Sequence, residues 1–289
     1  MRNWLSVFLL FIAFLFIAAG CSGHRSQDAE QRQFAQGNPT VTEVRFASAS
    51  LGQLLCYRAI VPSTQPGERL PVLYFLHGAN SGPDEVLQSS QIVQLAATER
   101  LIVILPDAGF SYYTNAQYGF HSRWEDAITT DLRADAEARF PILGGREHRG
   151  IAGISMGGYG AAKLALKHRE LYAWVGVLSG ALDITVRPMR LRRLDQCWRI
   201  CKIFGLRRST RMPEDVFVLL AHQGNPSGQR WMIACGRKDP LFGVNRRFAG
   251  ELKKRGTSVS WSSAEGGHDW GSWNSLLQSY LQDAAGHLH

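Results

Sequence analysis

Residues 153 to 160 read GISMGGYG, a serine between glycines directly after an apolar run. Gly153, Ser155 and Gly157 have the spacing Gly-x-Ser-x-Gly. The run HRGIAGI (148–154) is typical of a buried strand, and the residues after Gly157 have helical periodicity. We therefore expect Ser155 in a sharp turn between a strand and a helix, where the glycines let two backbones pass closely. This context disfavours a plain glycine turn.

Strand-like and helix-like segments alternate on both sides of this turn. Strands are expected at VTEVRFAS (41–48), QLLCYRAIV (53–61), PVLYFLHG (71–78), LIVILPD (101–107), HRGIAGI (148–154), AWVGVLSG (173–180), RWMIACG (230–236) and SVSWSSA (258–264). Helices are expected at about 84–98, 124–140, 157–167, 245–255 and 270–285. The alternation predicts an α/β fold with a mostly parallel central sheet of about eight strands and helices on both faces.

A serine hydroxyl is a weak nucleophile, so a catalytic Ser155 needs a histidine as base and a carboxylate that orients the histidine. Where the serine lies in a turn of this kind, the acid and then the histidine follow later in the chain, after strands of the sheet. Asp239 comes just after strand 230–236, and His268 comes just after strand 258–264. We expect Ser155, Asp239 and His268 to form the catalytic set.

Other residues compete for two of these roles. Asp183 follows strand 173–180 and is an alternative acid, whereas Asp269 adjoins His268 and should point elsewhere. His77 and His121 lie in loops that could reach the same edge of the sheet, but neither follows the final strand.

The negative oxygen of a tetrahedral intermediate requires preorganised donors, usually backbone N–H groups. The N–H of Met156 begins the helix after Ser155, where the helix dipole assists. The second donor is expected from the loop HGANSG (77–82), most plausibly from Ala79, since Gly78 allows that loop to come close. A phosphate-binding loop is disfavoured because HGANSG lacks the lysine of such motifs.

Seven motifs together are similar to one family. They are LYFLHGANSG (73–82), PDAGFSYYTN (106–115), WEDAITTDL (124–132), GISMGGYGA (153–161), LSGALD (178–183), CGRKDPLF (235–242) and GGHDWGSW (266–273). In this order they resemble the esterase D family of α/β-hydrolases, which includes S-formylglutathione hydrolases, feruloyl, acetyl-xylan and tributyrin esterases, and the antigen 85 mycolyltransferases. The likeness spans nearly all of residues 40–285. It implies the α/β-hydrolase fold, the same three catalytic residues, and an oxyanion hole at Ala79 and Met156.

The resemblance also narrows the expected function. His77 stands where antigen 85 enzymes carry aspartate, and S-formylglutathione hydrolases carry a different glycine loop there, so the chain looks closer to carbohydrate and short-acyl esterases. We predict a serine carboxylesterase that cleaves short-chain or carbohydrate-linked acyl esters through an acyl-enzyme. An acyltransferase acting on a sugar or lipid hydroxyl and a non-catalytic envelope binding module are the alternatives. No metal or organic cofactor is implied.

Aromatic residues cluster near the predicted site. Phe110, Tyr112, Trp270 and Trp273 are candidate substrate-binding residues, because their rings could stack on a sugar or an aromatic acyl group. The alternative for Trp270 and Trp273 is that both belong to the core of the closing helix.

The amino-terminal segment predicts export. Residues 1–20 carry a cation, an apolar run and small residues, as in a signal peptide, and IAAGC resembles the lipobox in which Cys21 is lipidated. Residues 21–39 are polar and read as a flexible tether, so the catalytic domain should span 40–289. These features predict a protein that is lipid-anchored in the bacterial cell envelope, on its periplasmic or extracellular face. The redox state of the remaining cysteines stays open.

The net charge of +8 is concentrated in a basic insertion, residues 187–211. Leu191, Leu194, Trp198 and Cys201 share a predicted helix face there. The insertion could be a lid, a contact with anionic lipids, or a solvated helix. Because the charge is local and the protein is expected to be exported, nucleic acid is not an expected partner.

Overall fold

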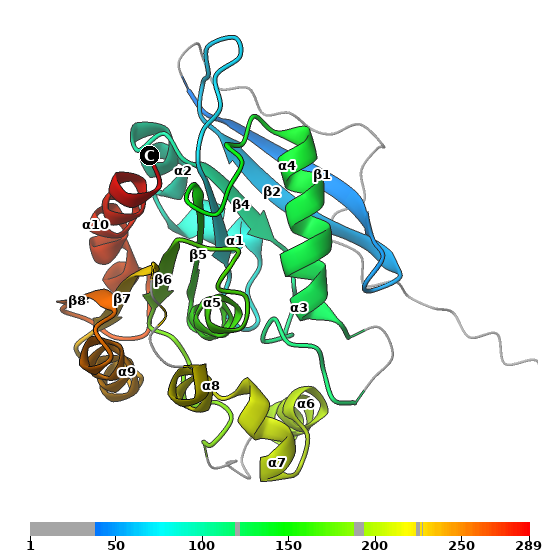
Figure 1. The fold of residues 1–289 in the computed structure, drawn as a ribbon, viewed down its shortest axis with the longest axis vertical. Helices are drawn as coiled ribbons and strands as arrows, with labels where there is room; N and C mark the ends of the chain where they lie inside the picture. The colour runs from blue at the N-terminus through cyan, green and yellow to red at the C-terminus, as the bar shows by residue number, and fades with distance from the viewer. Residues whose placement is uncertain (1–37, 119–121, 188–193, 224–225, 227) are drawn as a thin grey trace, which may run out of the picture.

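The centre of the sheet consists of short, almost wholly apolar strands, which are buried because helices cover both faces. The computed structural model describes residues 38–289 apart from 119–121, 188–193, 224–225 and 227 (Figure 1). The strands are β1 (Thr40–Ser48), β2 (Gln53–Val61), β3 (Val72–Leu76), β4 (Ile102–Pro106), β5 (Arg149–Ile154), β6 (Trp174–Leu178), β7 (Arg230–Gly236) and β8 (Ser258–Ala264).

These strands form one eight-stranded sheet in the order β1-β2-β4-β3-β5-β6-β7-β8. β1 and β2 form an antiparallel hairpin, β2 pairs antiparallel with β4, and all neighbours from β4 to β8 are parallel. The predicted α/β-hydrolase architecture with a mostly parallel sheet is confirmed. The carboxyl ends of the six parallel strands therefore meet at one edge, which is where such sheets place their ligands.

Helical segments fill the connections between strands. They are α1 (Pro83–Ser89), α2 (Ile92–Thr98), α3 (Trp124–Asp126), the π-helix η1 (Ala127–Leu132), α4 (Arg133–Arg139), α5 (Met156–Lys167), α6 (Leu194–Phe204), α7 (Arg208–Arg211), the 3₁₀-helix η3 (Met212–Glu214), α8 (Val216–Gln223), α9 (Phe242–Lys254) and α10 (Trp270–Leu288). In the part of the chain that the structure describes, no helix combines the length and apolar character needed to cross a bilayer.

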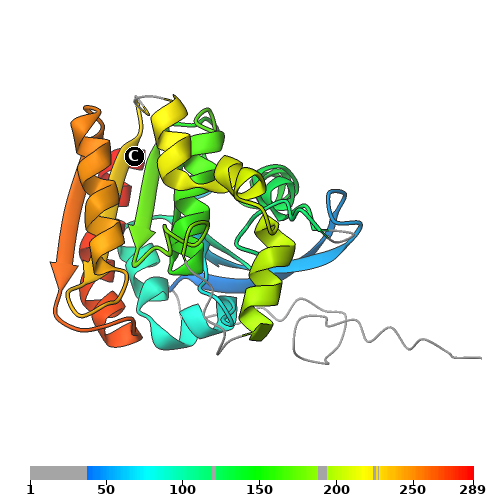
Figure 2. The same ribbon diagram turned by 90° about the horizontal axis from the view of Figure 1, so that it is seen from below.

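Alternation along the strands divides the core into two layers. In β3, the side chains of Val72 and Tyr74 pack with the cluster under α5 and α9, whereas Leu73 and Phe75 pack with the cluster under α2 and α10. Figures 1 and 2 show the sheet between these helix layers. Because both faces are covered, the central strands are apolar at nearly every position, with Arg149 at the start of β5 as an exception.

Two predicted helices differ in detail from those observed. The segment expected at 84–98 is split into α1 and α2 at Ser90, whose backbone is extended. The Ser90 hydroxyl donates to the carbonyl of Val86 at 2.6 Å and accepts from the amide of Ile92 at 3.2 Å. The side chain thus replaces helical backbone bonds, as serine commonly does at helix ends. The segment expected at 124–140 is helical throughout but contains the π-helix η1.

The turn from β5 to α5 depends on close backbone contacts. A Cβ added at Gly157 would collide with the carbonyl groups of Leu76 and His77 at the end of β3, and one added at Gly153 would collide with the backbone of Gly157. The helix can therefore start directly above β3 only because neither residue carries a side chain. This close approach brings Ser155 to the carboxyl edge of the sheet.

Gly157→Ala is predicted to lower the free energy of unfolding by roughly 1–3 kcal/mol or more, because the new methyl group meets immobile backbone. Gly250→Ala in α9 is the matched control, since a Cβ there meets nothing within 4 Å. The control should gain about 0.5–1 kcal/mol through the better helix propensity of alanine. Urea unfolding of both variants checks this, and equal midpoints would contradict it.

Candidate active site

Ser155 has a backbone conformation that only a well-supported turn can hold. Its φ is 56° and its ψ is −112°, outside the regions that non-glycine residues usually adopt. The amide of Ser155 donates to the carbonyl of Leu178 at 2.9 Å, and its carbonyl accepts from the amides of Tyr159 and Ala181. These bonds to β6 and α5 stabilise the strained conformation that directs the hydroxyl away from the sheet.

The structure brings Ser155, His268 and Asp239 together from three strand ends. The Oγ of Ser155 lies 2.9 Å from Nε2 of His268, and Nδ1 of His268 lies 2.8 Å from Oδ2 of Asp239. With Nδ1 protonated, the histidine donates to Asp239 and its Nε2 accepts from the serine hydroxyl. This tautomer is the one that can take up the serine proton.

Asp239 is suited to hold the histidine because it is buried and remains ionised. Burial favours the neutral acid, but hydrogen bonds from His268 and from the amide of Leu241 outweigh it and hold the pKa of this carboxyl below its usual range. The side chain of Asp239 is fully buried, whereas that of His268 is 31% exposed. The histidine therefore faces both a fixed anion and the open side of the site.

The ring of His268 also packs against the indole of Trp273. The indole of Trp273 meets it edge to face at a centroid distance of 5.0 Å, and the indole N–H donates to Oγ of Ser179 at 3.1 Å. Trp273 is 9% exposed, so it contributes packing against the histidine and presents little surface to a ligand.

The competing acids and histidines have other partners. Asp183 forms an ion pair with Arg187. Asp269 caps α10 by accepting from the amide of Ser272 at 2.9 Å. The rival histidine His121 lies outside the described residues.

His77 fastens two loops of the site together and is not a second base. Its Nδ1 donates to the carbonyl of Gly78 at 2.8 Å, and its Nε2 accepts from the amide of Ala108 at 3.1 Å. Burial lowers the pKa of His77, so its neutral form supplies one donor and one acceptor. The imidazole thus joins the loop after β3 to the loop after β4.

The loop expected to supply the second oxyanion donor lies against the serine. A Cβ at Gly78 would be 3.7 Å from Cβ of Ser155, so the backbone just before Ala79 passes directly beside the nucleophile candidate. Met156 is the first residue of α5, and its N–H has no acceptor one turn earlier within the helix. Both expected donors therefore belong to segments that adjoin Ser155.

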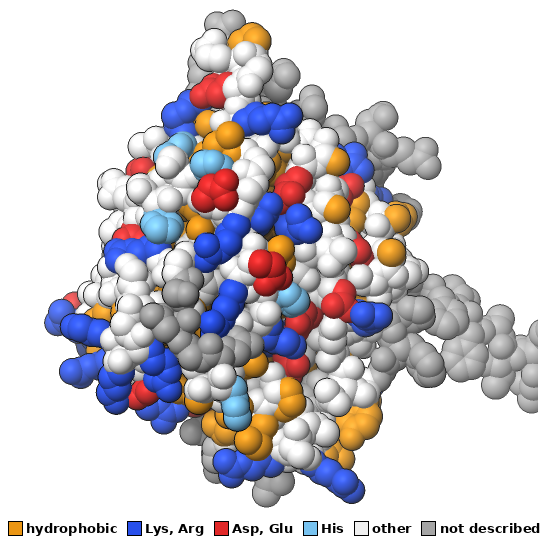
Figure 3. Space-filling view, in the orientation of Figure 1, with side chains coloured by type: hydrophobic (Ala, Val, Ile, Leu, Met, Phe, Trp, Pro, Cys, Tyr) orange, Lys and Arg blue, Asp and Glu red, His pale blue; other side chains and the backbone are white. Residues whose placement is uncertain are grey.

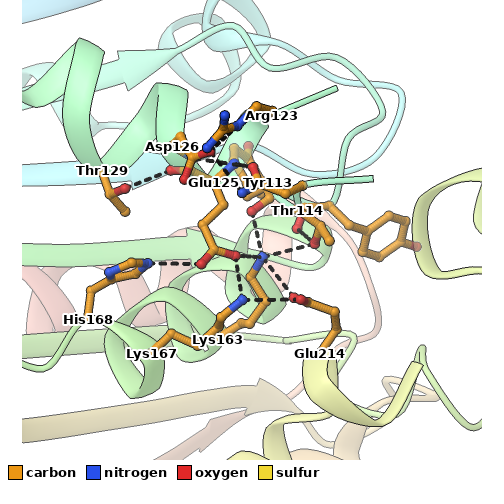
Figure 4. A network of polar contacts seen from close by, with 12 residues as sticks. Tyr113, Thr114, Arg123, Glu125, Asp126, Thr129, Lys163, Lys167, His168 and Glu214 are labelled. Carbon is orange, nitrogen blue, oxygen red and sulfur yellow. Dashed lines mark hydrogen bonds and ion pairs between the residues drawn. The ribbon is translucent and has the colours of Figure 1, made fainter. Parts of the chain in front are cut away.

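A buried ionic network around Lys163 of α5 was not predicted from the sequence. Lys163 is fully buried, and its Nζ donates to the carbonyl of Tyr113 at 2.7 Å, to Oγ1 of Thr114 at 3.0 Å and to a carboxylate oxygen of Glu125 at 2.9 Å (Figure 4). The Tyr113 hydroxyl donates in turn to the carbonyl of His77 at 2.9 Å. A chain of hydrogen bonds thus runs from the helix after Ser155 to the loop that carries Ala79.

Glu125 is the main anion of this network. Burial opposes its charge, but the hydrogen bond with His168 and the charges of Lys163 and Lys167 outweigh burial and hold the pKa of Glu125 well below its usual range. The stabilisation is complete above the ordinary glutamate pKa of about 4.3 and is lost as the pH falls toward the lower pKa of the folded state. Glu214 of η3 pairs with Lys163 and Lys167 and ties the end of the basic insertion to the same helix (Figure 4).

The four predicted substrate-binding aromatics divide into two kinds. Tyr112 is 6% exposed and packs edge to face on Phe110, Tyr159 and Phe204, so its ring belongs to the core, as does that of Trp273. Phe110 and Trp270 are half-buried. Trp270 donates from its indole N–H to Glu85 and packs on Trp273, whose ring contacts His268.

The basic insertion borders the site on one side. Phe204 at the end of α6 packs on Tyr112 and Tyr159. Arg199 lies over the ring of Phe110 at 4.1 Å and reaches Oδ1 of Asn80 in the loop after β3 at 3.5 Å. α6 therefore lies beside the loops at the carboxyl edge of the sheet, the edge that carries Ser155 and is called the active edge below.

The predicted apolar face of this helix is wrong at Trp198, which is 60% exposed. The side turned to the core carries the buried Ile203 and Phe204 together with the partly buried Cys197, Ile200 and Cys201, of which Cys201 belongs to the predicted face. Packing of Phe204 among the site tyrosines sets the rotation of α6, and amphipathic spacing alone could not. Leu191 lies outside the described residues.

The arrangement provides a nucleophile, a base, a fixed carboxylate and two candidate amide donors, which is the equipment of acyl transfer. Within residues 38–289, gaps aside, no group of three or more His, Cys, Asp or Glu side chains is placed to hold a metal ion.

Comparisons with known proteins identify the family and the fold. The model of the family Esterase, described as "Putative esterase", matches residues 48–284. An acetyl esterase of Caldicellulosiruptor saccharolyticus is 28% identical over 258 residues, 84% of this chain and 97% of the relative. The fluorophosphonate-binding serine hydrolase FphF of Staphylococcus aureus superposes with a TM-score of 0.74 at 23% identity, over 86% of this chain and 99% of that one. A ferulic acid esterase gives 0.73 at 22% identity, over 86% and 98%.

Lys163→Gln is predicted to lower the free energy of unfolding by about 3–5 kcal/mol at neutral pH, because it leaves buried carboxylates without their cation. Lys254→Gln is the control, since Lys254 forms an ion pair of the same type but is 72% exposed. Its urea midpoint should not change. A similar loss of stability in both variants would mean that the buried network stabilises the fold no more than an exposed ion pair does.

Proposed function

We propose that this chain, which belongs to the Esterase family of carboxylic ester hydrolases, cleaves short-chain or carbohydrate-linked acyl esters with Ser155, His268 and Asp239. The match over residues 48–284 confirms the family predicted from the motifs. The observation that carries the proposal is the pair of hydrogen bonds from Ser155 to His268 at 2.9 Å and from His268 to Asp239 at 2.8 Å.

The first half of the reaction forms an acyl-enzyme. The Oγ of Ser155 attacks the ester carbonyl carbon while Nε2 of His268 takes the hydroxyl proton, and Asp239 stabilises the resulting imidazolium. The carbonyl oxygen becomes an oxyanion and accepts hydrogen bonds from the amides of Ala79 and Met156. When the intermediate collapses, the bond from carbon to the alcohol oxygen breaks, and His268 returns the proton to the leaving alcohol.

The second half releases the acid. His268 removes a proton from water, and the hydroxide attacks the acyl carbon on Ser155. The bond to Oγ then breaks, the serine recovers its proton from His268, and the carboxylic acid leaves. A sugar hydroxyl in place of water would make the same acyl-enzyme an acyltransferase, so the acceptor distinguishes the two activities.

One comparison and one feature of the structure support this substrate class. The relative that matches 84% of the chain is an acetyl esterase, which favours a short acyl group. The half-buried rings of Phe110 and Trp270 lie near the site and provide flat apolar surfaces of the kind that stack on sugar rings.

We also propose that the protein is exported and anchored by a lipid on Cys21. The sequence of residues 1–21 supports this through its cationic start, apolar run and IAAGC ending. The polar residues 22–39 would then join the membrane to β1, which begins at Thr40. At full extension these residues span roughly 60 Å, enough for the domain to reorient on the surface.

The three catalytic roles predict a specific pattern of losses. Ser155→Ala and Asp239→Asn should each lower kcat for p-nitrophenyl acetate by roughly four orders of magnitude, without unfolding the protein. Asp183→Asn is the matched control and should retain near wild-type kcat, because Asp183 pairs with Arg187 and not with His268.

The measurement uses the chain from Ser22 onward with p-nitrophenyl acetate, butyrate and octanoate and methyl ferulate, with and without a sugar acceptor. Acyl-sugar products would identify the transferase. Folded protein that neither turns over any ester nor reacts with a fluorophosphonate probe would favour the envelope binding module and sink the esterase.

Lipid attachment has its own test. Expressed in a bacterial host fed labelled palmitate, the full chain should incorporate the label and fractionate with membranes, whereas Cys21→Ser should not be labelled. Cys197→Ser is the control for loss of another cysteine and should remain labelled. Label that persists in Cys21→Ser would overturn the assignment.

A further inference from the structure

Exposed hydrophobic side chains gather on one part of the molecule. Among the residues that the structure describes, six large hydrophobics are exposed, and only Leu54 lies far from the basic insertion in the chain and in the fold. The other five are Tyr118, Val186, Trp198, Leu206 and Met212. The first of these is joined to the insertion through its amide, which donates to the carbonyl of Lys202 at 3.0 Å.

The outer side of α6 is where this surface is most distinct. Trp198 is 60% exposed, and Nζ of Lys202, one turn later, lies 3.6 Å from the centre of its ring. The spacing of four residues puts the ring of Trp198 and the ammonium of Lys202 in one row along α6. Leu206, which is 70% exposed, comes after the end of α6 at Phe204 and after Gly205, whose φ is 82°.

Leu206 also borders a hollow of about 310 Å³ between the start and the end of the insertion. Thr185, Val186, Leu206, Arg208 and Arg211 line this hollow. Apolar and cationic side chains therefore adjoin each other there as well. Figure 3 shows orange and blue side chains side by side along the lower edge of the molecule, where Figure 1 places α6 and α7.

The charge of this surface is almost wholly positive. Five cations are exposed in the described part of the insertion: Arg187, Arg199, Lys202, Arg207 and Arg208. Asp195 is the exposed acid of the same part, and Asp183 neutralises Arg187. Such a surface repels other cations and attracts a dense array of negative charges.

We propose that this surface, formed by α6, α7 and the residues beside them, docks the protein on an anionic lipid bilayer. Tryptophan and lysine are suited to the headgroup region, because the ring lies at the apolar boundary while the ammonium meets phosphate. A soluble polyanion would use the cations but leave Trp198, Val186 and Leu206 in water. The mixture of both side-chain types therefore favours lipid over nucleic acid.

Docking in this way would hold the active edge near the membrane surface. The side of α6 next to the docking row carries Arg199, which contacts Phe110 and Asn80 beside the site. A single lipid chain binds membranes only marginally, and a basic surface supplies the second attachment that stable anchoring requires. The inference shares its setting with the proposed lipid anchor, but it concerns the folded domain and does not depend on ester hydrolysis.

The experiment measures vesicle binding by the chain from Ser22 onward with Ser155→Ala, so that neither a lipid anchor nor turnover contributes. This chain retains both hydrophobic clusters and the whole sheet, which lie within residues 38–289, so it keeps every contact of the described fold. Vesicles of phosphatidylcholine are compared with vesicles of phosphatidylcholine and phosphatidylglycerol in equal parts, at low and at high salt.

Binding is expected to the anionic vesicles and to weaken with salt. Arg207→Gln with Arg208→Gln should lower the partition coefficient roughly 25-fold, about fivefold for each cation. Lys253→Gln with Lys254→Gln on α9 removes the same charge elsewhere and should change it less than twofold. Trp198→Ala should weaken vesicle binding, whereas Leu54→Ala, which removes an even more exposed hydrophobic side chain from the β1–β2 hairpin, should not.

Three results would overturn the proposal. The first is no binding to anionic vesicles by the folded chain. The second is equal loss from the α9 and insertion variants, which would reduce the effect to net charge. The third is tight binding to heparin that ignores Trp198→Ala, together with weak vesicle binding, which would identify a soluble polyanion as the partner. None of these outcomes bears on esterase activity, which is measured separately on the wild-type chain.

Discussion

The left-handed backbone of Ser155 is the constraint on which the rest of the site depends. A non-glycine residue with φ of 56° is disfavoured unless its surroundings hold it, and here hydrogen bonds to Leu178, Tyr159 and Ala181 do so. The turn fits because Gly153 and Gly157 let α5 start against the end of β3. The strain at Ser155 is thus offset by hydrogen bonds from β6, from the residue Ala181 after it, and from α5.

From this turn, α5 organises the surrounding loops. Its Lys163 reaches Tyr113, whose hydroxyl holds the loop after β3, and its Tyr159 donates to the carbonyl of Glu214 in η3, just after the insertion. A buried charge is costly, and it is tolerated here because several acceptors and carboxylates surround the ammonium. The same helix that positions the proposed nucleophile therefore also positions the loop proposed to bind the oxyanion.

The basic insertion contacts the active edge on one side and is exposed to solvent on the other. One side of α6 packs through Phe204 into the tyrosines of the site, another carries Arg199 toward Phe110 and Asn80, and a third exposes Trp198 and Lys202. A helix that packs on the site and also contacts a surface could orient the site relative to that surface. This division of roles follows from the rotation of the helix, which Phe204 determines.

The alternation of apolar strands and amphipathic helices was enough to predict the α/β sheet, because local periodicity reflects burial on one or both faces. Together with the Gly-x-Ser-x-Gly spacing, it also nominated Ser155, Asp239 and His268, since each follows a strand whose end reaches the same edge. The sequence did not reveal the roles of His77, Tyr113 and Lys163, because their partners are 31, 36 and 50 residues away. Trp198 was predicted to face the core but is exposed to solvent. Periodicity shows that a helix has an apolar face, but it does not show which side of the helix packs against the rest of the fold. Local sequence patterns thus determined the order of the elements and the site candidates. The buried contacts that hold the site in place were decided only by the packing of segments that are distant in the chain.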